Sequence, residues 1–378
     1  MRFRRLIRTV AICAAAPALL SAQQWMVEPK PLLELRGVTD AGSILFGSVN
    51  WATRLPNGSV VVADASGPAL HFIDAAGKLI KSAGRAGQGP GDFRTVTWVA
   101  KCGAEGIVAW DFAQTRATVY DDAGTMRRTF ALGGRGGAQT SSSCNDRGQF
   151  VQMGGFRRVA PPTPPDQALG YSFLQFFASP QIVGTRSDTL AALAEVPVGE
   201  MVAGNMGGRG SGGMPRPIGA QTAFALSADR LYVGIADSSL IAVFGLDGKR
   251  LATITVHVPP RATTRANYER AAEISLSMVP TQMRDGARKW VLAIPMPMKL
   301  PPFTGLYVDP VGALWVVLSA PGDADTRLRS YATDGRVLGN ITIPVNLNVF
   351  EVGANYVLGA REDANGEQYV SIYSFQRR

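Results

Sequence analysis

A short repeating unit constrains the fold of this chain more than any other feature of its sequence. Each copy has an apolar run, a tight turn, a second run that often ends in Asp, a third run that ends in an aromatic residue, and an Asp–Gly turn. The clearest copy covers residues 55–77, with Asp64 and Phe72 ending two of the runs and Gly77 closing the last turn. Such a unit is a small sheet that cannot bury both of its faces alone, so neighbouring copies must stack against it.

Three further copies keep this pattern and two are less regular. The regular copies reach their aromatic residue at Tyr120, Phe244 and Tyr331. A Pro-rich interruption at residues 161–165 loosens the third copy, and the last copy ends with the chain before its fourth strand. Because the unit returns at intervals of roughly 40–45 residues, we predict an all-β, six-bladed β-propeller with four-stranded blades. A two-sheet β-sandwich, which also uses short strands and frequent turns, is the alternative.

The two ends of the chain are expected to share the last blade. Residues 31–36 are the predicted missing strand, and their pairing with the C-terminal strands would leave no free sheet edge. A propeller can run to 378 residues as one domain. We therefore expect residues 23–378 to form a single propeller domain.

An insertion interrupts the repeat between the fourth and fifth blades, over residues 261–300. Thr263 and Thr264 are suitable N-terminal caps for a helix that runs to Met278, and residues 283–294 predict a second helix. This short helical insertion has two interpretations: it packs on the blades, or it forms a lid that binds a ligand or partner at one ring face.

Residues 1–22 have the layout of a signal peptide. They carry four arginines and no acidic residue, then an apolar stretch that begins at Val10, and they end at Ala22 before Gln23. The uncharged stretch is shorter than the about 20 residues that span a bilayer. We expect cleavage near Ala22, a periplasmic or secreted protein, and no membrane span.

The charge balance does not indicate a nucleic-acid partner. The formal net charge is +9, but removal of the four arginines in the signal segment leaves +5. These charges are spread along the chain without a dense Lys/Arg face, which is typical of a solvated surface.

Two cysteines remain after the signal segment, Cys102 and Cys144. Each precedes a turn glycine of its repeat by four residues, namely Gly106 and Gly148, so the two would occupy matching places on adjacent blades. An oxidising compartment favours a disulfide between them. Two independent buried thiols are the alternative.

Two segments resemble a known family. Residues 84–93 are similar to the Gly-x-Gly-x-Gly-Pro-Gly-x-Phe signature of exported bacterial six-bladed β-propellers, which are relatives of the NHL-repeat and TolB-like groups. Residues 296–315 resemble the Pro-flanked linker that enters a blade, with the turn Asp309 to Gly312 before Leu314 and Trp315. The resemblance implies a propeller fold and export, and it implies no particular activity.

Candidate catalytic residues are few. The chain has two histidines, so a three-histidine metal site is impossible within it. His71 falls on a third strand and His257 at the end of an outer strand, so neither lies on a predicted inner strand. The innermost predicted strands supply Asn50, Asn348 and Glu351, of which only one is a carboxylate. Because a calcium site needs several oxygen ligands at one point, we predict no metal and no cofactor.

We therefore predict a non-enzymatic, monomeric binding module that recognises an unidentified protein or small molecule at one ring face. The candidate binding residues are Asn50, Asn348 and Glu351 in the channel and Arg85, Arg209 and Arg216 in loops. One alternative is a metal-dependent hydrolase or lyase of the lactonase-like propeller type. Another is an extracellular adhesion scaffold with a broad apolar patch.

Overall fold

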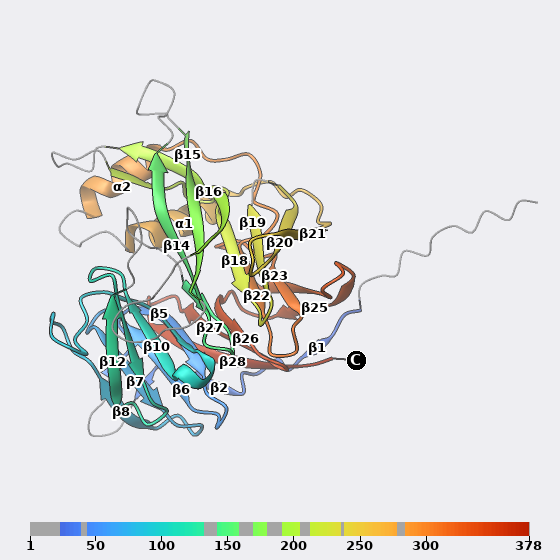
Figure 1. Cartoon of the computed structure of the whole chain (residues 1–378). Coiled ribbons are helices and arrows are strands. Elements are labelled where there is room, and N and C mark those ends of the chain that lie inside the picture. Colours follow the sequence, from blue (N-terminus) through green and yellow to red (C-terminus); the bar gives the residue numbers. More distant parts are fainter. Residues whose placement is uncertain are drawn as a thin grey trace, which may run out of the picture.

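The computed structural model describes residues 23–38, 44–131, 142–158, 169–179, 191–204, 212–235, 238–277 and 284–377. The predicted signal segment, residues 1–22, and the candidate Arg209 lie outside these ranges. Figure 1 shows short strands gathered into small sheets, with the two helices to one side of them. The described chain is therefore built mainly of β-structure, as predicted.

Four of the sheets follow the repeat unit, and in each of them every strand pairs antiparallel with the next strand along the chain. Their strands are β5 (Val49–Arg54), β6 (Val60–Asp64), β7 (Ala69–Ile73) and β8 (Leu79–Ala83); β9 (Val96–Lys101), β10 (Ile107–Asp111), β11 (Arg116–Tyr120) and β12 (Met126–Ala131); β18 (Thr222–Leu226), β19 (Arg230–Ile235), β20 (Leu240–Gly245) and β21 (Arg250–Thr255); and β22 (Gly305–Val308), β23 (Leu314–Val317), β24 (Thr326–Tyr331) and β25 (Val337–Ile343).

The closing blade takes strands from both ends of the chain. Its C-terminal strands are β26 (Asn348–Val352), β27 (Tyr356–Glu362) and β28 (Gln368–Gln376). Along the outer edge of β28 lie β2 (Leu33–Leu35) and β1 (Met26–Val27), which pair with different parts of that strand. The predicted N-terminal closing strand is confirmed within residues 31–36, and β1 is an additional piece that the sequence did not indicate.

The prediction of six four-stranded blades is wrong. Five blades follow the repeat unit, and the closing one has five strands because its outer edge is split. Of the other two sheets, one is the pair of short strands β3 (Gly37–Val38) and β4 (Ile44–Leu45). The larger one departs from the unit: it has five strands, and two of them are more than ten residues long. Its strands are β13 (Ser142–Cys144), β14 (Phe150–Arg158), β15 (Leu169–Ser179), β16 (Ala191–Gly204) and β17 (Gly212–Pro215).

The long strands of the irregular sheet are explained by the sequence that connects them. In the regular blades an Asp–Gly turn ends a strand after about five residues, because Gly accepts the positive φ that the turn needs. The sequence between β14, β15 and β16 lacks the Asp–Gly spacing of the regular copies, and pairing of β15 with β16 continues from Leu169 to Ala178 with two register shifts. The sheet nevertheless joins the others, since β13 contacts both β9 and β18.

The inner strands succeed one another around the molecule. Strand β5 contacts β9 and β26, and β22 contacts β18 and β26, so the first strand of each meander faces the first strand of its neighbours. This radial arrangement is that of a β-propeller and excludes a two-layer sandwich. Because the same meander recurs, all inner strands begin at one ring face and end at the other.

Asp residues at the strand ends hold the blades in shape. Asp74 accepts hydrogen bonds from the N–H groups of Ala76 and Lys78, and Gly77 after it has φ +87°. At the end of β10, Asp111 accepts from the N–H groups of Arg94 and Thr95, at 2.6 and 3.3 Å. These carboxylates therefore cap the turns and strand ends of the blades.

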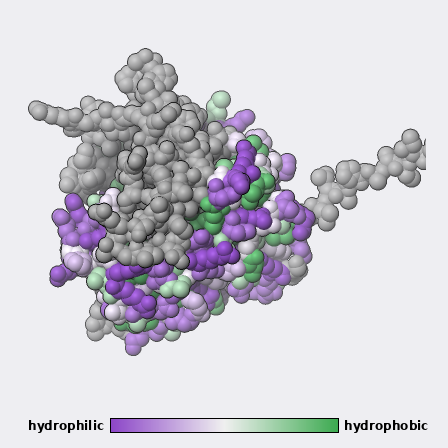
Figure 2. Space-filling model, in the orientation of Figure 1, coloured by the Kyte–Doolittle hydropathy of each residue, from purple (hydrophilic) through white to green (hydrophobic). Residues whose placement is uncertain are grey.

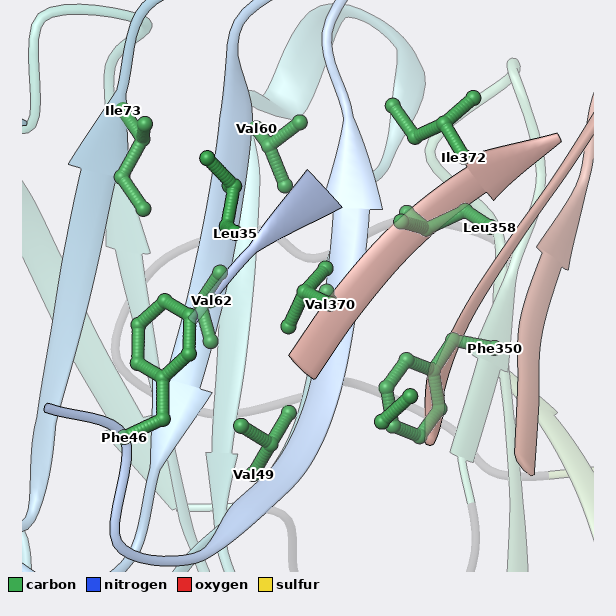
Figure 3. Packing of buried hydrophobic residues seen from close by; sticks show 12 residues of the cluster. Leu35, Phe46, Val49, Val60, Val62, Ile73, Phe350, Leu358, Val370 and Ile372 are labelled. Atoms are coloured by element: carbon green, nitrogen blue, oxygen red, sulfur yellow. The ribbon is translucent and has the colours of Figure 1, made fainter. Parts of the chain in front are cut away.

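A hydrophobic cluster joins the first blade to the closing blade (Figure 3). Leu35 on β2 lies between Val60 and Val62 of β6 on one side and Val370 of β28 on the other. These side chains are at most 4 % exposed, and burial of each stabilises the fold by about 1.5–3 kcal/mol. Segments from the two ends of the chain thus share one core.

The two chain ends also meet in an aromatic cluster. The ring of Trp25 stacks on Phe375 at 6.1 Å and meets the edge of Trp315 at 5.6 Å. The guanidinium of Arg377 lies over these rings and pairs with the buried carboxylate of Asp309. This contact fixes residues that directly follow the predicted signal segment.

The helical insertion is present between β21 and β22, as α1 (Arg265–Ser277) and α2 (Arg284–Ala293). Thr264 caps α1, since its Oγ1 accepts from the N–H of Asn267 while the Asn267 side chain accepts from the N–H of Thr264. The hydroxyl of Tyr268 donates to carbonyls at the end of α2, at 2.7 and 2.8 Å. The two helices therefore form one packed unit.

Candidate functional site

A cavity of about 550 Å³, here called the interblade pocket, opens between the β18–β21 blade and the β22–β25 blade. Its lining includes Leu318 directly after β23, Arg327 at the start of β24, and Thr342 near the end of β25. These positions mark one end of the strands, so the pocket lies at one ring face. Among the described residues its lining includes none from β18 or β22, so it stands apart from the central channel.

The walls of the interblade pocket are partly apolar. Leu300 contributes an aliphatic side chain from the insertion linker, Ile218 from the segment between β17 and β18, and Leu318 and Ile341 from the β22–β25 blade. The linkers that enter and leave the insertion add five prolines: Pro259, Pro260, Pro297, Pro301 and Pro302. Figure 2 shows hydrophobic and hydrophilic residues close together over the region where Figure 1 places β18–β25. Because proline fixes φ, these walls are comparatively rigid.

Two of the arginines in the lining are held by one carboxylate. Asp323 accepts from Arg261 Nη1 and from Arg327 Nη2, both at 2.8 Å, and from the N–H of Ala320. Asn267 of α1 donates to the other oxygen of Asp323. Burial raises the pKa of Asp323, but the hydrogen bonds from Ala320 and Arg261 outweigh it and the pKa is lowered overall. Asp323 therefore stays ionised and connects the insertion to the blade.

Two further cations complete the lining. Arg329 donates from Nε to the side chain of Asn340 at 2.8 Å and from Nη1 to the carbonyl of His257 at 2.6 Å. Lys299 lies on the linker that leaves the insertion, and its backbone pairs with Ala262. Arg327 and Arg329 are two residues apart on β24, so both point to the same face of the strand.

One acidic residue, Glu200 of β16, also lines the pocket. It forms an ion pair with the predicted binding residue Arg216 at 3.0 Å, and the side chains of Arg216 and Glu200 are only 10% and 17% exposed. Arg216 also donates to the carbonyl of Pro295 after α2, at 2.6 Å. Arg216 therefore secures the insertion beside the pocket.

The predicted channel residues lie elsewhere. Asn50 Nδ2 donates to the carbonyl of Val96 at 2.7 Å, which ties β5 to β9. Asn348 is exposed at the first position of β26. Both therefore lie toward the ring face at which the inner strands begin.

Glu351 lies near the end of β26, toward the opposite ring face. Its carboxylate accepts from Thr53 Oγ1 at 2.6 Å and from the hydroxyl of Tyr356. Arg54 lies over the Tyr356 ring at 4.7 Å. Burial raises the pKa of Glu351, and the hydrogen bonds from Thr53 and Tyr356 oppose that rise. These contacts join the first blade to the closing blade.

The structure does not bring the candidate binding residues together at one point. Arg85 is exposed and pairs with Asp92 within its own loop, at 3.2 Å. Arg216 lies near the interblade pocket, and Asn50, Asn348 and Glu351 lie on inner strands. Their part in ligand binding stays a prediction.

The predicted disulfide is present between Cys102 and Cys144. Their Cα atoms are 5.5 Å apart, within the usual range for a disulfide. The bond links the end of β9 to β13, so it fastens the irregular sheet to the preceding blade.

Both histidines of the chain, His71 and His257, are among the described residues. Within them, no group of three or more His, Cys, Asp or Glu side chains could hold a metal ion. Burial lowers the pKa of His71, whose Nδ1 contacts the Ser82 hydroxyl at 3.0 Å. His257 is exposed just after β21. Among the described segments, moreover, no helix combines the length and apolar character required to cross a membrane.

Sequence reasoning missed the four cations of the pocket. Arg327 and Arg329 stand at alternate positions in a strand-like run, and Arg261 and Lys299 begin and end the insertion. Pro259 and Pro260 directly precede Arg261, and Pro301 and Pro302 follow Lys299 after one intervening residue. That combination was visible, but only the folded chain shows that the linkers run beside the start of β24.

No known protein-family model matches this chain, and no curated protein matches it. Solved structures are similar over most of its length. A member of the DUF4221 family from Bacteroides vulgatus has a TM-score of 0.49 and 10% identity, over 94% of this chain and 100% of that one. A Bacteroides fragilis protein described as exported has a TM-score of 0.46 and 10% identity, over 90% and 94%. A gluconolactonase from Xanthomonas campestris has a TM-score of 0.44 and 14% identity, over 94% and 98%.

Proposed function

We propose that this protein is an exported β-propeller binding module that holds a small molecule in the interblade pocket. The main observation behind this proposal is the cavity of about 550 Å³, which lies within the range of roughly 300–1,000 Å³ typical of small-molecule sites. Its mixture of apolar walls and a few polar groups is also typical of such sites. Export rests on the signal-peptide layout of residues 1–22, and the mature protein acts as a monomer in this proposal.

Two features support the pocket over the central channel. Several polar side chains of the inner strands are already engaged within the protein, as with Asn50 on Val96 and Glu351 on Thr53. In the pocket, by contrast, the exposed cation Lys299 lines an open space of ligand size. The helical insertion borders this space through its linkers, which gives the insertion a role in ligand binding.

A blocking variant tests the proposal. Thr342 is exposed on β25, the outermost strand of its blade, and lines the pocket. Thr342→Trp places a large ring in the cavity at a strand position that tolerates aromatic residues. Thr129→Trp, on the outermost strand β12 of another blade, is the matched control.

The readout is native mass spectrometry after incubation of the mature protein with a small-molecule extract of its native envelope. We expect a ligand adduct on the wild type and on Thr129→Trp, and its loss on Thr342→Trp. Equal adducts on all three proteins, or none on any of them, would contradict the proposal.

A further inference from the structure

We propose that the interblade pocket selects a small anion with an apolar portion, such as a medium-chain carboxylate or an alkyl phosphate. This inference rests on the proposed function and specifies the class of ligand. It concerns the cleft between two blades, away from the inner strands of the ring.

Charge is the first argument. Four cationic side chains line the pocket, namely Arg261, Lys299, Arg327 and Arg329, against the single carboxylate of Glu200. That carboxylate is already paired with Arg216, which lies outside the lining. Asp323 pairs with Arg261 and Arg327 in the same way, and Asp325 also pairs with Arg327. The uncompensated positive charge therefore comes from Arg329 and Lys299. An uncharged ligand would remove water from these two cations without compensating them.

The second argument is that contacts within the protein already hold the arginine side chains in place without a ligand. Asp323 fixes Arg261 and Arg327, and it is not itself among the lining residues. Arg329 is fixed by Asn340 and the carbonyl of His257. A guanidinium has five N–H donors in a planar fork, so an arginine held in this way still suits a carboxylate or phosphate.

Lys299 adds a mobile charge to the fixed ones. Within the part of the chain that the structure describes, its ammonium group has no hydrogen bond or ion pair. It is exposed on the linker opposite β24 and lines the same cavity. A cation of this kind can close on a bound anion, as lysine does at phosphate sites.

The apolar walls are the third argument. Leu318 and Val258 are partly exposed, and Pro259 and Pro260 are exposed, in the same lining as the cations. An inorganic anion alone would leave these side chains in contact with water, whereas an alkyl portion would cover them and gain the hydrophobic contribution. The combination favours an amphipathic anion over a bare one.

The test is isothermal titration of the mature protein with defined probes: octanoate, octyl phosphate, 1-octanol, acetate and inorganic phosphate. We expect octanoate or octyl phosphate to bind at least about tenfold more tightly than 1-octanol and than the matching bare anion. Higher ionic strength should weaken this binding, because part of the attraction is between charges.

Substitutions of residues that line the pocket test whether octanoate binds there. Lys299→Gln should lower affinity for octanoate several-fold without affecting the fold, since its side chain is exposed. Arg329→Gln should lower it further, with Lys289→Gln on the exposed face of α2 as a control that leaves affinity unchanged. Octanoate binding that persists in Thr342→Trp would overturn the inference.

The remaining outcomes separate this inference from the proposed function. If 1-octanol binds as tightly as octanoate and Thr342→Trp abolishes both, the pocket binds small molecules but does not select anions. If no probe binds while the envelope adduct still depends on Thr342, the ligand class is wrong. Binding only to vesicles of phosphatidylglycerol, compared with phosphatidylcholine, would show a membrane surface as the partner and also overturn the inference.

Discussion

At the scale of single residues, Asp323 connects the helical insertion to the β22–β25 blade. Its carboxylate receives hydrogen bonds from the insertion through Arg261 and Asn267, and from the blade through Ala320 and Arg327. Its side chain is 12 % exposed, so these charge-assisted bonds are only partly screened by water. Loss of this carboxylate should therefore disturb both the stability of the fold and the shape of the interblade pocket.

We predict that Asp323→Asn lowers the free energy of unfolding by about 1–3 kcal/mol at pH 7. The pKa of Asp323 is lowered in the folded state, so its contribution is present above the unfolded-state pKa and is lost as pH falls through the folded one. The difference in stability between wild type and variant should therefore shrink below about pH 4. Urea unfolding across a pH series measures this.

A surface ion pair provides the control for this prediction. Arg336 and Asp334 lie 3.9 Å apart, and their side chains are 69% and 66% exposed. Asp334→Asn should change stability by no more than about 0.5 kcal/mol at any pH in the series. Equal effects of the two substitutions would contradict the role assigned to Asp323.

At the scale of elements, the N-terminal segment packs against β25 at a position where glycine leaves room for a ring. Gly339 on β25 faces the ring of Trp25, and a Cβ at this position would come within 2.4 Å of that ring. The N-terminal segment reaches β25 through this contact and through the hydrogen bonds between Gln23, Trp25 and Asn340. A methyl group should push the segment away from the blade.

We predict that Gly339→Ala destabilises the protein by about 1–3 kcal/mol, because a well-packed contact cannot absorb the added methyl group. Gly286→Ala is the matched change, since nothing lies within 4 Å of its Cβ position in α2. There alanine should stabilise by about 0.5–1 kcal/mol, because it loses less backbone entropy in a helix. Thermal unfolding of the two variants should thus give shifts of opposite sign, and shifts of the same sign would refute the argument.

The disulfide acts between elements as well. It joins β9 to β13 across a sequence separation of 42 residues. We predict that the double change Cys102→Ser and Cys144→Ser costs about 2–5 kcal/mol, measured by chemical unfolding. A reducing agent should lower the stability of the wild type and leave that of the double variant unchanged. Equal sensitivity of the two proteins to reductant would show that the bond does not contribute.

At the scale of the whole molecule, sequence patterns predicted what depends on local chemistry. The Asp–Gly turns and the capping of α1 by Thr264 were readable because they involve neighbours in sequence. The closing strand near Leu33 was also predictable, since the last repeat lacked a strand. The long strands β15 and β16 were not, because the third copy offers no turn signal that would fix their ends.

The interblade pocket was not predictable from the sequence. Its cations come from the insertion linkers and from β24. Its apolar residues include Ile218, which lies between β17 and β18. Only the packing of the insertion onto the blade, through Asp323, brings them together. The candidates on the inner strands did not indicate it, and the insertion was predicted only to pack on the blades or to form a lid at one ring face.

The most direct test of the account is a crystal structure of the mature protein grown with octanoate. The account predicts electron density for the ligand between β24 and the insertion linkers, with the carboxylate near Arg329 and Lys299 and the alkyl chain against Leu318 and Val258. Density in the central channel beside Asn348, with the interblade pocket empty, would contradict it.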